Sequence, residues 1–364
     1  MNADNHMRKK TRRIMLGNLA VGGGAPVSVQ TMTKTDTRDV DATVSQISRI
    51  EAAGCDIVRL AVVDEDAARA LRDIKMQTTM PLIADIHFNH RLALLAIESG
   101  VDGLRINPGN IGGSGNVKEV VSAARERRLP IRIGVNSGSI EPAIEARYGN
   151  TAEALVESAL GHVALLEELD YHEIKISVKA SDVIRTLAAY RLLSARCDYP
   201  LHLGVTEAGT FLAGTVRSSL GIGILLSEGI GDTIRVSLTD TPEREVAVGL
   251  ELLRALELRA GGAAVISCPT CGRVQVDVAG LAGEVEVALE SFYRDSPVVR
   301  RPVVAVMGCM VNGPGEARHA DIALAGGQGK YALYRNGEMI CTVNEKDALQ
   351  TLIKTVEEWC ADVS

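Results

Sequence analysis

Three cysteines late in the chain have the residue types and spacing of metal ligands. Cys268 and Cys271 form the pair in CPTCGR, and Cys309 follows in MGCMVNGPGEARHAD. A Cys-x-x-Cys pair is either half of a metal site or a complete redox dithiol. Three thiolates leave a four-ligand site one ligand short, and Glu316 stands in the same loop as Cys309. An iron–sulfur cluster with three thiolates and one replaceable oxygen ligand accounts best for this set.

A zinc site and a redox dithiol are the alternatives for these cysteines. A zinc ribbon usually supplies a second Cys-x-x-Cys pair or histidines, and a thioredoxin-type dithiol needs no third cysteine. Spacing alone leaves zinc open. Seven cysteines without a signal peptide indicate reduced thiols and therefore a cytoplasmic protein. The remaining four have apolar neighbours and are expected to be packing thiols: Cys55, Cys197, Cys341 and Cys360.

A second group of polar residues lies in or just after the predicted strands of the first 240 residues. Charged side chains inside strands are costly unless they are paired or used, and any single arginine could belong to a structural ion pair. Five cations against two carboxylates instead predict an anionic ligand, and a diphosphate suits the planar fork of arginine. The cations are Arg59, Arg105, Arg132, Lys179 and Arg235; the carboxylates are Asp85 and Glu207; His87, Asn107, Asn136 and Ser237 accompany them.

The composition excludes two classes of partner. A net charge of −7 gives no general attraction to nucleic-acid phosphates, and 3% aromatic residues are too few for base-stacking platforms. The basic run at residues 8–13 precedes a stretch that is too short and too rich in glycine for a membrane span. We therefore expect neither nucleic-acid nor membrane binding.

An α/β framework must position these residues. From residue 25 to about 240, short β-branched runs alternate with stretches of helical periodicity. This cadence predicts a (β/α)8 TIM barrel, whose strand ends and following loops build the active site. An open doubly wound sheet is the alternative, but the first strand lacks its glycine fingerprint. The predicted strands are residues 26–32, 56–62, 82–88, 102–107, 130–136, 173–178, 200–206 and 232–238.

The character of the sequence changes after about residue 262. We expect a barrel domain in residues 1–262 and a smaller α+β iron–sulfur domain in residues 263–364. The second domain contains the candidate metal ligands, a closing amphipathic helix and a hairpin. The hairpin is predicted around Asn336-Gly337, because this dipeptide is a strong turn signal.

Ten motifs in one order resemble the 4-hydroxy-3-methylbut-2-enyl diphosphate synthase family of the non-mevalonate isoprenoid pathway, in its compact bacterial form. The resemblance covers residues 12–358. Its motifs are VQTMTKTDTRD, VRLAV, ADIHFN, GLRINPGNIG, RIGVNSGS, SVKASD, LGVTEAG, IRVSLT, SCPTCGR and VAVMGCMVNGPGEA.

The resemblance implies a cofactor, a substrate and a set of site residues. It implies a [4Fe–4S] cluster on Cys268, Cys271, Cys309 and Glu316. It implies that the barrel binds 2-C-methyl-D-erythritol 2,4-cyclodiphosphate, with Glu207 as the proton-donating carboxylate and Glu316 as the exchangeable ligand. The implied substrate contacts are Arg59, Asp85, His87, Arg105, Asn107, Arg132, Asn136, Lys179, Arg235 and Ser237.

The same resemblance implies a homodimer in which the barrel of one subunit and the cluster domain of the other form the active site. The expected reaction is a reductive ring-opening dehydroxylation, with electrons from a reduced flavodoxin or ferredoxin. Two other functions are compatible with the residues alone. One is a hydrolase or transferase with a structural zinc module, and the other is an electron-transfer module on a barrel scaffold.

Overall fold

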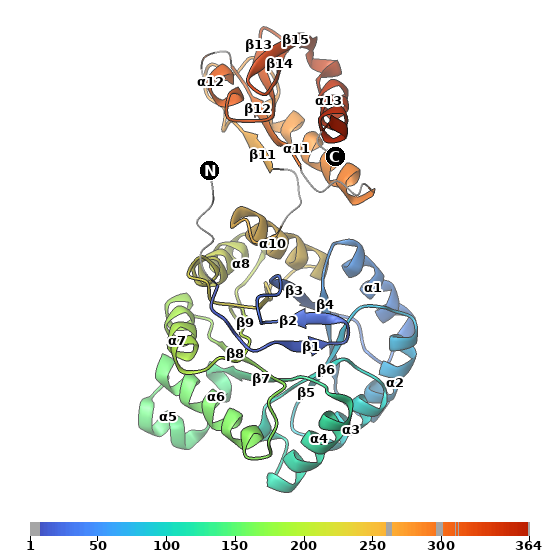
Figure 1. Ribbon diagram of the computed structural model, residues 1–364, viewed down its shortest axis with the longest axis vertical. Coiled ribbons are helices and arrows are strands. Elements are labelled where there is room, and N and C mark those ends of the chain that lie inside the picture. Colours follow the sequence, from blue (N-terminus) through green and yellow to red (C-terminus); the bar gives the residue numbers. More distant parts are fainter. Residues whose placement is uncertain (1–7, 260–263, 296–300, 310, 312, 363–364) are drawn as a thin grey trace. The chain divides into compact units, whose positions relative to one another are not determined.

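The computed structural model describes residues 8–259, 264–295, 301–309, 311 and 313–362 (Figure 1). The chain divides into two compact units, Met1–Arg259 and Ala260–Ser364. The boundary predicted between residues 262 and 263 lies outside the described residues. No helix in the described ranges is long and apolar enough to cross a lipid bilayer.

The first unit is the predicted TIM barrel. Its sheet runs in the order β8-β7-β6-β5-β4-β3-β10-β9, and a bridge between Ile176 and Leu201 joins β8 to β9 and closes it. All eight strands occur where alternation predicted them. They are β3 (Ser28–Met32), β4 (Ile57–Val62), β5 (Leu82–Ile86), β6 (Gly103–Ile106), β7 (Ile131–Asn136), β8 (Ile174–Lys179), β9 (His202–Leu203) and β10 (Thr233–Ile234).

Helices surround the strands (Figure 1). Several begin at side-chain caps: Asp39, Asp64 and Asp182 each accept a hydrogen bond from a backbone N–H of the first turn, which starts a helix soon after a strand. The helices are α1 (Val40–Ala52), α2 (Glu65–Met76), α3 (His90–Glu98), α4 (Ser114–Arg127), α5 (Pro142–Tyr148), α6 (Ala152–Glu167), α7 (Val183–Arg196), α8 (Phe211–Ser218), α9 (Ile224–Ser227) and α10 (Pro242–Ala255).

A hairpin fills the amino-terminal end of the barrel. Strands β1 (Ile14–Leu16) and β2 (Leu19–Val21) pair antiparallel, and Leu16 packs with Ile57 and Ile83 in a small apolar cluster. Leu16 lies so close to β6 that a Cβ atom on Gly103 would come within 2.5 Å of its Cδ1. Ile57 and Ile83 lie near the first residues of their strands, so the hairpin covers the end opposite the predicted site.

The second unit is an α+β fold around a five-stranded sheet in the order β11-β12-β13-β14-β15. Helices α11 and α13 share one apolar core with the sheet, which includes Val285, Leu352 and Trp359. The predicted hairpin turns at Asn336 and Gly337, both of which have positive φ. The elements are β11 (Ala264–Ser267), α11 (Val278–Asp295), β12 (Val303–Met307), α12 (Gly313–Ala317), β13 (Ile322–Gly327), β14 (Lys330–Arg335), β15 (Glu338–Asn344) and α13 (Ala348–Asp362).

Candidate active site

A row of charged residues crosses four adjacent strands inside the barrel. The parallel register pairs Asp85 on β5 with Arg105 on β6, Arg105 with Arg132 on β7, and Arg132 with Lys175 on β8. Neighbouring strands lie about 4.8 Å apart, so three cations stand side by side with one carboxylate at the end of the row. All four residues are buried.

Asp85 is the counter-ion at that end. Its carboxylate lies 3.3 Å from Nη1 of Arg105, 3.6 Å from Nε of Arg59 and 3.5 Å from Nε2 of His87. Burial alone would raise the pKa of Asp85, but Arg59, His87 and Arg105 together lower it well below its usual range. Asp85 is therefore ionised and compensates part of the surrounding positive charge.

Arg132 and Lys179 have no carboxylate partner among the described residues. Nη1 of Arg132 donates to Oγ of Ser177 at 2.8 Å. Lys179 lies against the backbone near Gly204, where an added Cβ would come within 2.6 Å of Nζ. Burial, followed by repulsion from neighbouring cations, lowers the pKa of both side chains well below their usual values. These charges are costly to bury, and an anion would offset that cost.

Arg235 is compensated by a carboxylate that sequence analysis did not single out. Glu245 on α10 is 2% exposed and its Oε2 lies 3.7 Å from Nε of Arg235. The same carboxylate accepts a hydrogen bond from Thr31 at 2.7 Å and lies 3.4 Å from Nζ of Lys34. Burial lowers the pKa of Arg235 to about 10, because Glu245 compensates only part of the cost.

Several buried donors in this region have no hydrogen-bond partner within the described structure. They are Nε of Arg105, Nε of Arg132, Nε of Arg235 and Nδ2 of Asn107. Buried donors are nearly always satisfied in folded proteins, so four buried donors without a partner on these strands favour a ligand with several acceptor oxygens. We call Arg59, Arg105, Arg132, Lys179 and Arg235 the clamp.

The structure brings most of the predicted barrel residues together and adds two that the sequence analysis did not name. Glu245 is a second carboxylate buried among the cations, whereas Glu207 is exposed and follows β9. Lys175 was missed, although a lysine inside the predicted strand EIKISV is the kind of signal that identified the others. Asn136 at the end of β7 and Ser237 after β10 are half-buried, and His87 is exposed beside Asp85.

Three loops that carry candidate site residues each contain a non-glycine residue with positive φ. Phe88 next to His87, Glu207, and Thr270 within the Cys-x-x-Cys turn have φ values of 63°, 53° and 62°. Non-glycine residues rarely adopt this left-handed conformation, and such strain gathers at functional sites. The loops that carry His87, Glu207 and the Cys268/Cys271 pair therefore have the strained backbone that is typical of functional sites.

The second unit places two of the predicted cysteines at the carboxyl ends of two adjacent parallel strands. Cys268 follows β11 and Cys309 follows β12, the adjacent parallel strand. The backbone N–H of Cys268 still donates to the carbonyl of Val306 at 3.1 Å, so the two strand ends stay in register. Glu316 lies in α12, which begins just beyond Cys309.

The residues present suit an iron–sulfur cluster in donor type and backbone placement. The N–H of Thr270 donates to Sγ of Cys268 at 3.3 Å, and N–H bonds of this kind tune cluster potentials. Cys271 and Glu316 are exposed at the same loops. Across the described residues, no three cysteine, histidine or acidic side chains are gathered as ligands around one point. A bound cluster would draw the side chains of these loops together.

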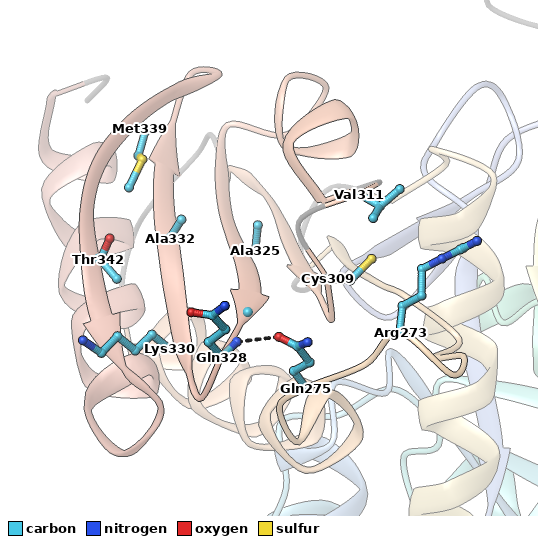
Figure 2. A pocket seen from close by; sticks show the side chains of 11 residues that line it. Arg273, Gln275, Cys309, Val311, Ala325, Gln328, Lys330, Ala332, Met339 and Thr342 are labelled. Atoms are coloured by element: carbon cyan, nitrogen blue, oxygen red, sulfur yellow. Dashed lines mark hydrogen bonds between the residues drawn. The ribbon is translucent and has the colours of Figure 1, made fainter.

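Cys309 borders a pocket over one face of the sheet, which Val311 and Arg273 also line (Figure 2). Small side chains of β13 and β14 form its floor, and the N–H of Gln328 donates to Oε1 of Gln275 at 2.7 Å across one end. The lining residues are Arg273, Gln275, Cys309, Val311, Ala325, Gly327, Gln328, Lys330, Ala332, Met339 and Thr342.

Both units match models of one protein family. Residues 11–250 match the GcpE TIM-barrel domain, and residues 264–358 match the GcpE protein C-terminal domain. These matches define the class: a two-domain barrel oxidoreductase of the GcpE type.

The chain belongs to the 4-hydroxy-3-methylbut-2-en-1-yl diphosphate synthase (flavodoxin) family, which confirms the resemblance. It is 58% identical to the member from Geobacter sulfurreducens, over 98% of this chain and 99% of the relative. It is 55% identical to the member from Lawsonia intracellularis, over 94% of both chains.

Comparison with solved structures supports the fold alone. A dihydropteroate synthase from Stenotrophomonas maltophilia aligns with a TM-score of 0.51 at 11% identity, covering 68% of this chain and 97% of the other. At this identity the match confirms the barrel and says nothing about ligands.

Proposed function

We propose that this chain reduces 2-C-methyl-D-erythritol 2,4-cyclodiphosphate to 4-hydroxy-3-methylbut-2-enyl diphosphate, with loss of one oxygen as water. The observation that carries the proposal is the excess of buried cations over carboxylates at the barrel mouth. Asp85 and Glu245 form ion pairs with Arg59, Arg105 and Arg235, and among the described residues no carboxylate forms an ion pair with Arg132 or Lys179, which suits a diphosphate site. The names of close relatives supply the same product.

The clamp residues would bind and orient the substrate. Arg105 and Arg132 present unpaired Nε–H groups from adjacent strands, and Lys179 adds a point charge. Charge-assisted hydrogen bonds from arginine forks fix the orientation of phosphoryl groups. Asn107, Asn136, Ser237 and His87 lie at the same strand ends and would hold the remaining oxygens. Asp85 keeps Arg59 and Arg105 in place between turnovers.

Cys268, Cys271, Cys309 and Glu316 are the residues that would hold a [4Fe–4S] cluster. When bound, the cluster would supply electrons one at a time. Glu316 is the one oxygen ligand in this set, so it is the ligand we expect to exchange. Glu207 is exposed on the left-handed turn after β9, and we infer that it would deliver a proton to the departing hydroxyl group.

We also propose that the enzyme works as a homodimer, with the barrel of one subunit facing the cluster unit of the other. Exposed apolar side chains on α8 and the following turn support an interface, because such patches mark protein contacts. They are Phe211, Leu212, Val216 and Leu220. The electron donor is a reduced flavodoxin or ferredoxin, for which Arg273 and Lys330 at the pocket beside Cys309 offer positive charge.

The thiol ligands support a cytoplasmic location, because thiols remain reduced there. The boundary between the two functional domains is proposed at residues 262–263, as the sequence predicts.

The proposal is tested on protein purified without oxygen. Iron, sulfide and zinc are measured, and turnover of the cyclodiphosphate with reduced flavodoxin is followed. We expect about four irons and four sulfides per chain, and activity that depends on the donor. Arg105→Ala should weaken substrate binding about 10- to 100-fold, since one charge-assisted bond contributes about 1.5–3 kcal/mol. One zinc without sulfide would support the hydrolase alternative, and unchanged binding by the variant would exclude the clamp.

A further inference from the structure

Lys175 is a buried amine that the proposed reaction leaves without a role. It is the register partner of Arg132, and alternation along β8 turns its side chain to the same face as Ser177 and Lys179. The residue is 2% exposed, and its Nζ has no hydrogen-bond partner within the described chain. Burying a lysine without a partner costs folding free energy, so such a residue is expected to have a function.

Two arginines and a histidine face Lys175 from other strands. Arg132 on β7 and Arg59 on β4 repel an ammonium group there. His202 on β9 is fully buried, and its Nδ1 lies 2.8 Å from Oγ1 of Thr233. Burial, and then the surrounding cations, hold the pKa of His202 well below its usual value, so His202 stays neutral. None of these groups stabilises a charge on Lys175.

Asp232, just before β10, is the acidic residue that faces Lys175. Its carboxylate already accepts hydrogen bonds from the N–H of Leu201 at 2.9 Å, from Thr11 at 3.0 Å and from Arg8 at 3.2 Å. It attracts Lys175 through space without bonding to it. Burial first, and then repulsion from Arg132, lower the pKa of Lys175 to about 7.

We propose that Lys175 takes up a proton when a diphosphate enters the clamp, so that substrate binding and protonation of this amine are coupled. The inference rests on the proposed function for the identity of the ligand. Negative charge beside Arg132 offsets the repulsion that Arg132 and Arg59 exert on an ammonium group, and it attracts that group directly, so the buried amine binds a proton more readily. In the cyclic diphosphate each phosphorus carries one acidic oxygen that is already ionised at neutral pH, so the proton comes from solvent.

The sign of the pH effect follows from this coupling. Below about pH 7 Lys175 is protonated before and after binding, and affinity is highest. Above that pH the free protein holds a neutral amine that must be protonated on binding, so affinity falls as pH rises. The parent should therefore bind the cyclodiphosphate more weakly at pH 9 than at pH 7.

Titration calorimetry at pH 8 in two buffers with different heats of ionisation measures the number of protons taken up. We expect uptake approaching one proton per site in the parent, and its loss in Lys175→Met together with the pH dependence of affinity. His87→Gln tests the exposed titratable group beside Arg105; because His87 is also an expected substrate contact, the uptake is compared per molecule of ligand bound, and on that scale it should persist. Uptake that persists in Lys175→Met, or disappears in His87→Gln, overturns the inference, as does binding by the parent without uptake.

A measurement without ligand separates this inference from the proposed function. If the parent does not bind the cyclodiphosphate, the proposed function fails, and the titration of Lys175 is then judged from stability. The cost of burying the charged lysine is full below about pH 7 and vanishes above its ordinary value of 10.5. Lys175→Met should therefore raise the melting temperature more at pH 7 than at pH 10.5. An equal shift at both pH values would mean that Lys175 does not titrate.

Discussion

Gly134 on β7 provides the space and the acceptor that fix the guanidinium group of Arg105. Its carbonyl oxygen accepts a hydrogen bond from Nη2 of Arg105 at 3.2 Å. A Cβ atom at Gly134 would lie 2.7 Å from Nε of the same arginine. The absent side chain is therefore part of how the clamp is built.

Gly134→Ala should displace the tip of Arg105 while the strand stays in place, because the clash is with a flexible side chain. We expect substrate affinity to fall about tenfold, as for loss of one charge-assisted bond, measured by titration calorimetry. Gly161→Ala on α6 is the control, since a Cβ atom added there would meet nothing within 4 Å and alanine favours a helix. Equal affinity of Gly134→Ala and the parent would show that Arg105 does not contact the ligand.

Asp85→Asn should destabilise the protein, because it leaves Arg59 and Arg105 buried without their counter-ion. Removing one partner of a buried ion pair costs about 3–5 kcal/mol. The folded-state pKa of Asp85 lies below its unfolded value, so its contribution is present above about pH 4 and is lost as pH falls further. The difference between parent and variant should therefore shrink at acid pH.

Chemical denaturation followed by circular dichroism at pH 7 and pH 3 checks this expectation. Asp198→Asn is the control, because Asp198 pairs with Arg12 at the surface, where an ion pair contributes about 0–1 kcal/mol. A difference for Asp85→Asn that stays constant between the two pH values would contradict the assignment.

Glu245→Gln should make the clamp more dependent on its ligand. The substitution removes the charge that compensates Arg235 and Lys34 but keeps an acceptor for Thr31. We expect a lower melting temperature without ligand and a larger upward shift on addition of the cyclodiphosphate, since the ligand's charge replaces the lost one. Glu243 on the same helix pairs with Arg49 at the surface, so Glu243→Gln should behave like the parent. A smaller shift in Glu245→Gln than in the parent would refute this.

Cys309→Ser should lose most bound iron and sulfide, whereas Cys341→Ser should retain both. Cys309 follows β12 as Cys268 follows the adjacent β11, while Cys341 is exposed on β15. Even changes behind the ligand shell reduce metal affinity about 10- to 100-fold, so losing a ligand should cost at least as much. Iron and sulfide analysis of the two variants decides the matter; equal content in both would remove Cys309 from the ligand set.

The barrel and the five cations of its clamp could be predicted from the sequence, because short β-branched runs, and charges within or just after them, are local signals. Arg59, Arg105 and Arg132 stand out as charges within apolar runs, and the same rule applied to EIKISV identifies Lys175. Strands β9 and β10 are shorter than predicted, at two residues each, although the N–H of Arg235 still donates to the carbonyl of Leu203 at 3.0 Å just beyond them.

Glu245 could not be found in this way. It lies in PEREVAVGLELL, where a glutamate on a helix normally faces water. Its burial depends on how α10 packs against β3, a tertiary contact that brings it to Thr31. The approach of Cys268 to Cys309 likewise depends on the parallel pairing of β11 and β12, which their spacing along the chain does not reveal.

The hairpin of β1 and β2 has a kinetic consequence. Leu16 and its neighbours close the amino-terminal end of the barrel. Substrate therefore enters, and product leaves, at the opposite end. A product molecule that still occupies the mouth excludes the next substrate molecule. Each turnover therefore ends only when the product has left through the opening by which the substrate entered. Inhibition by the product diphosphate should accordingly be competitive: it raises the apparent KM and leaves the limiting rate unchanged.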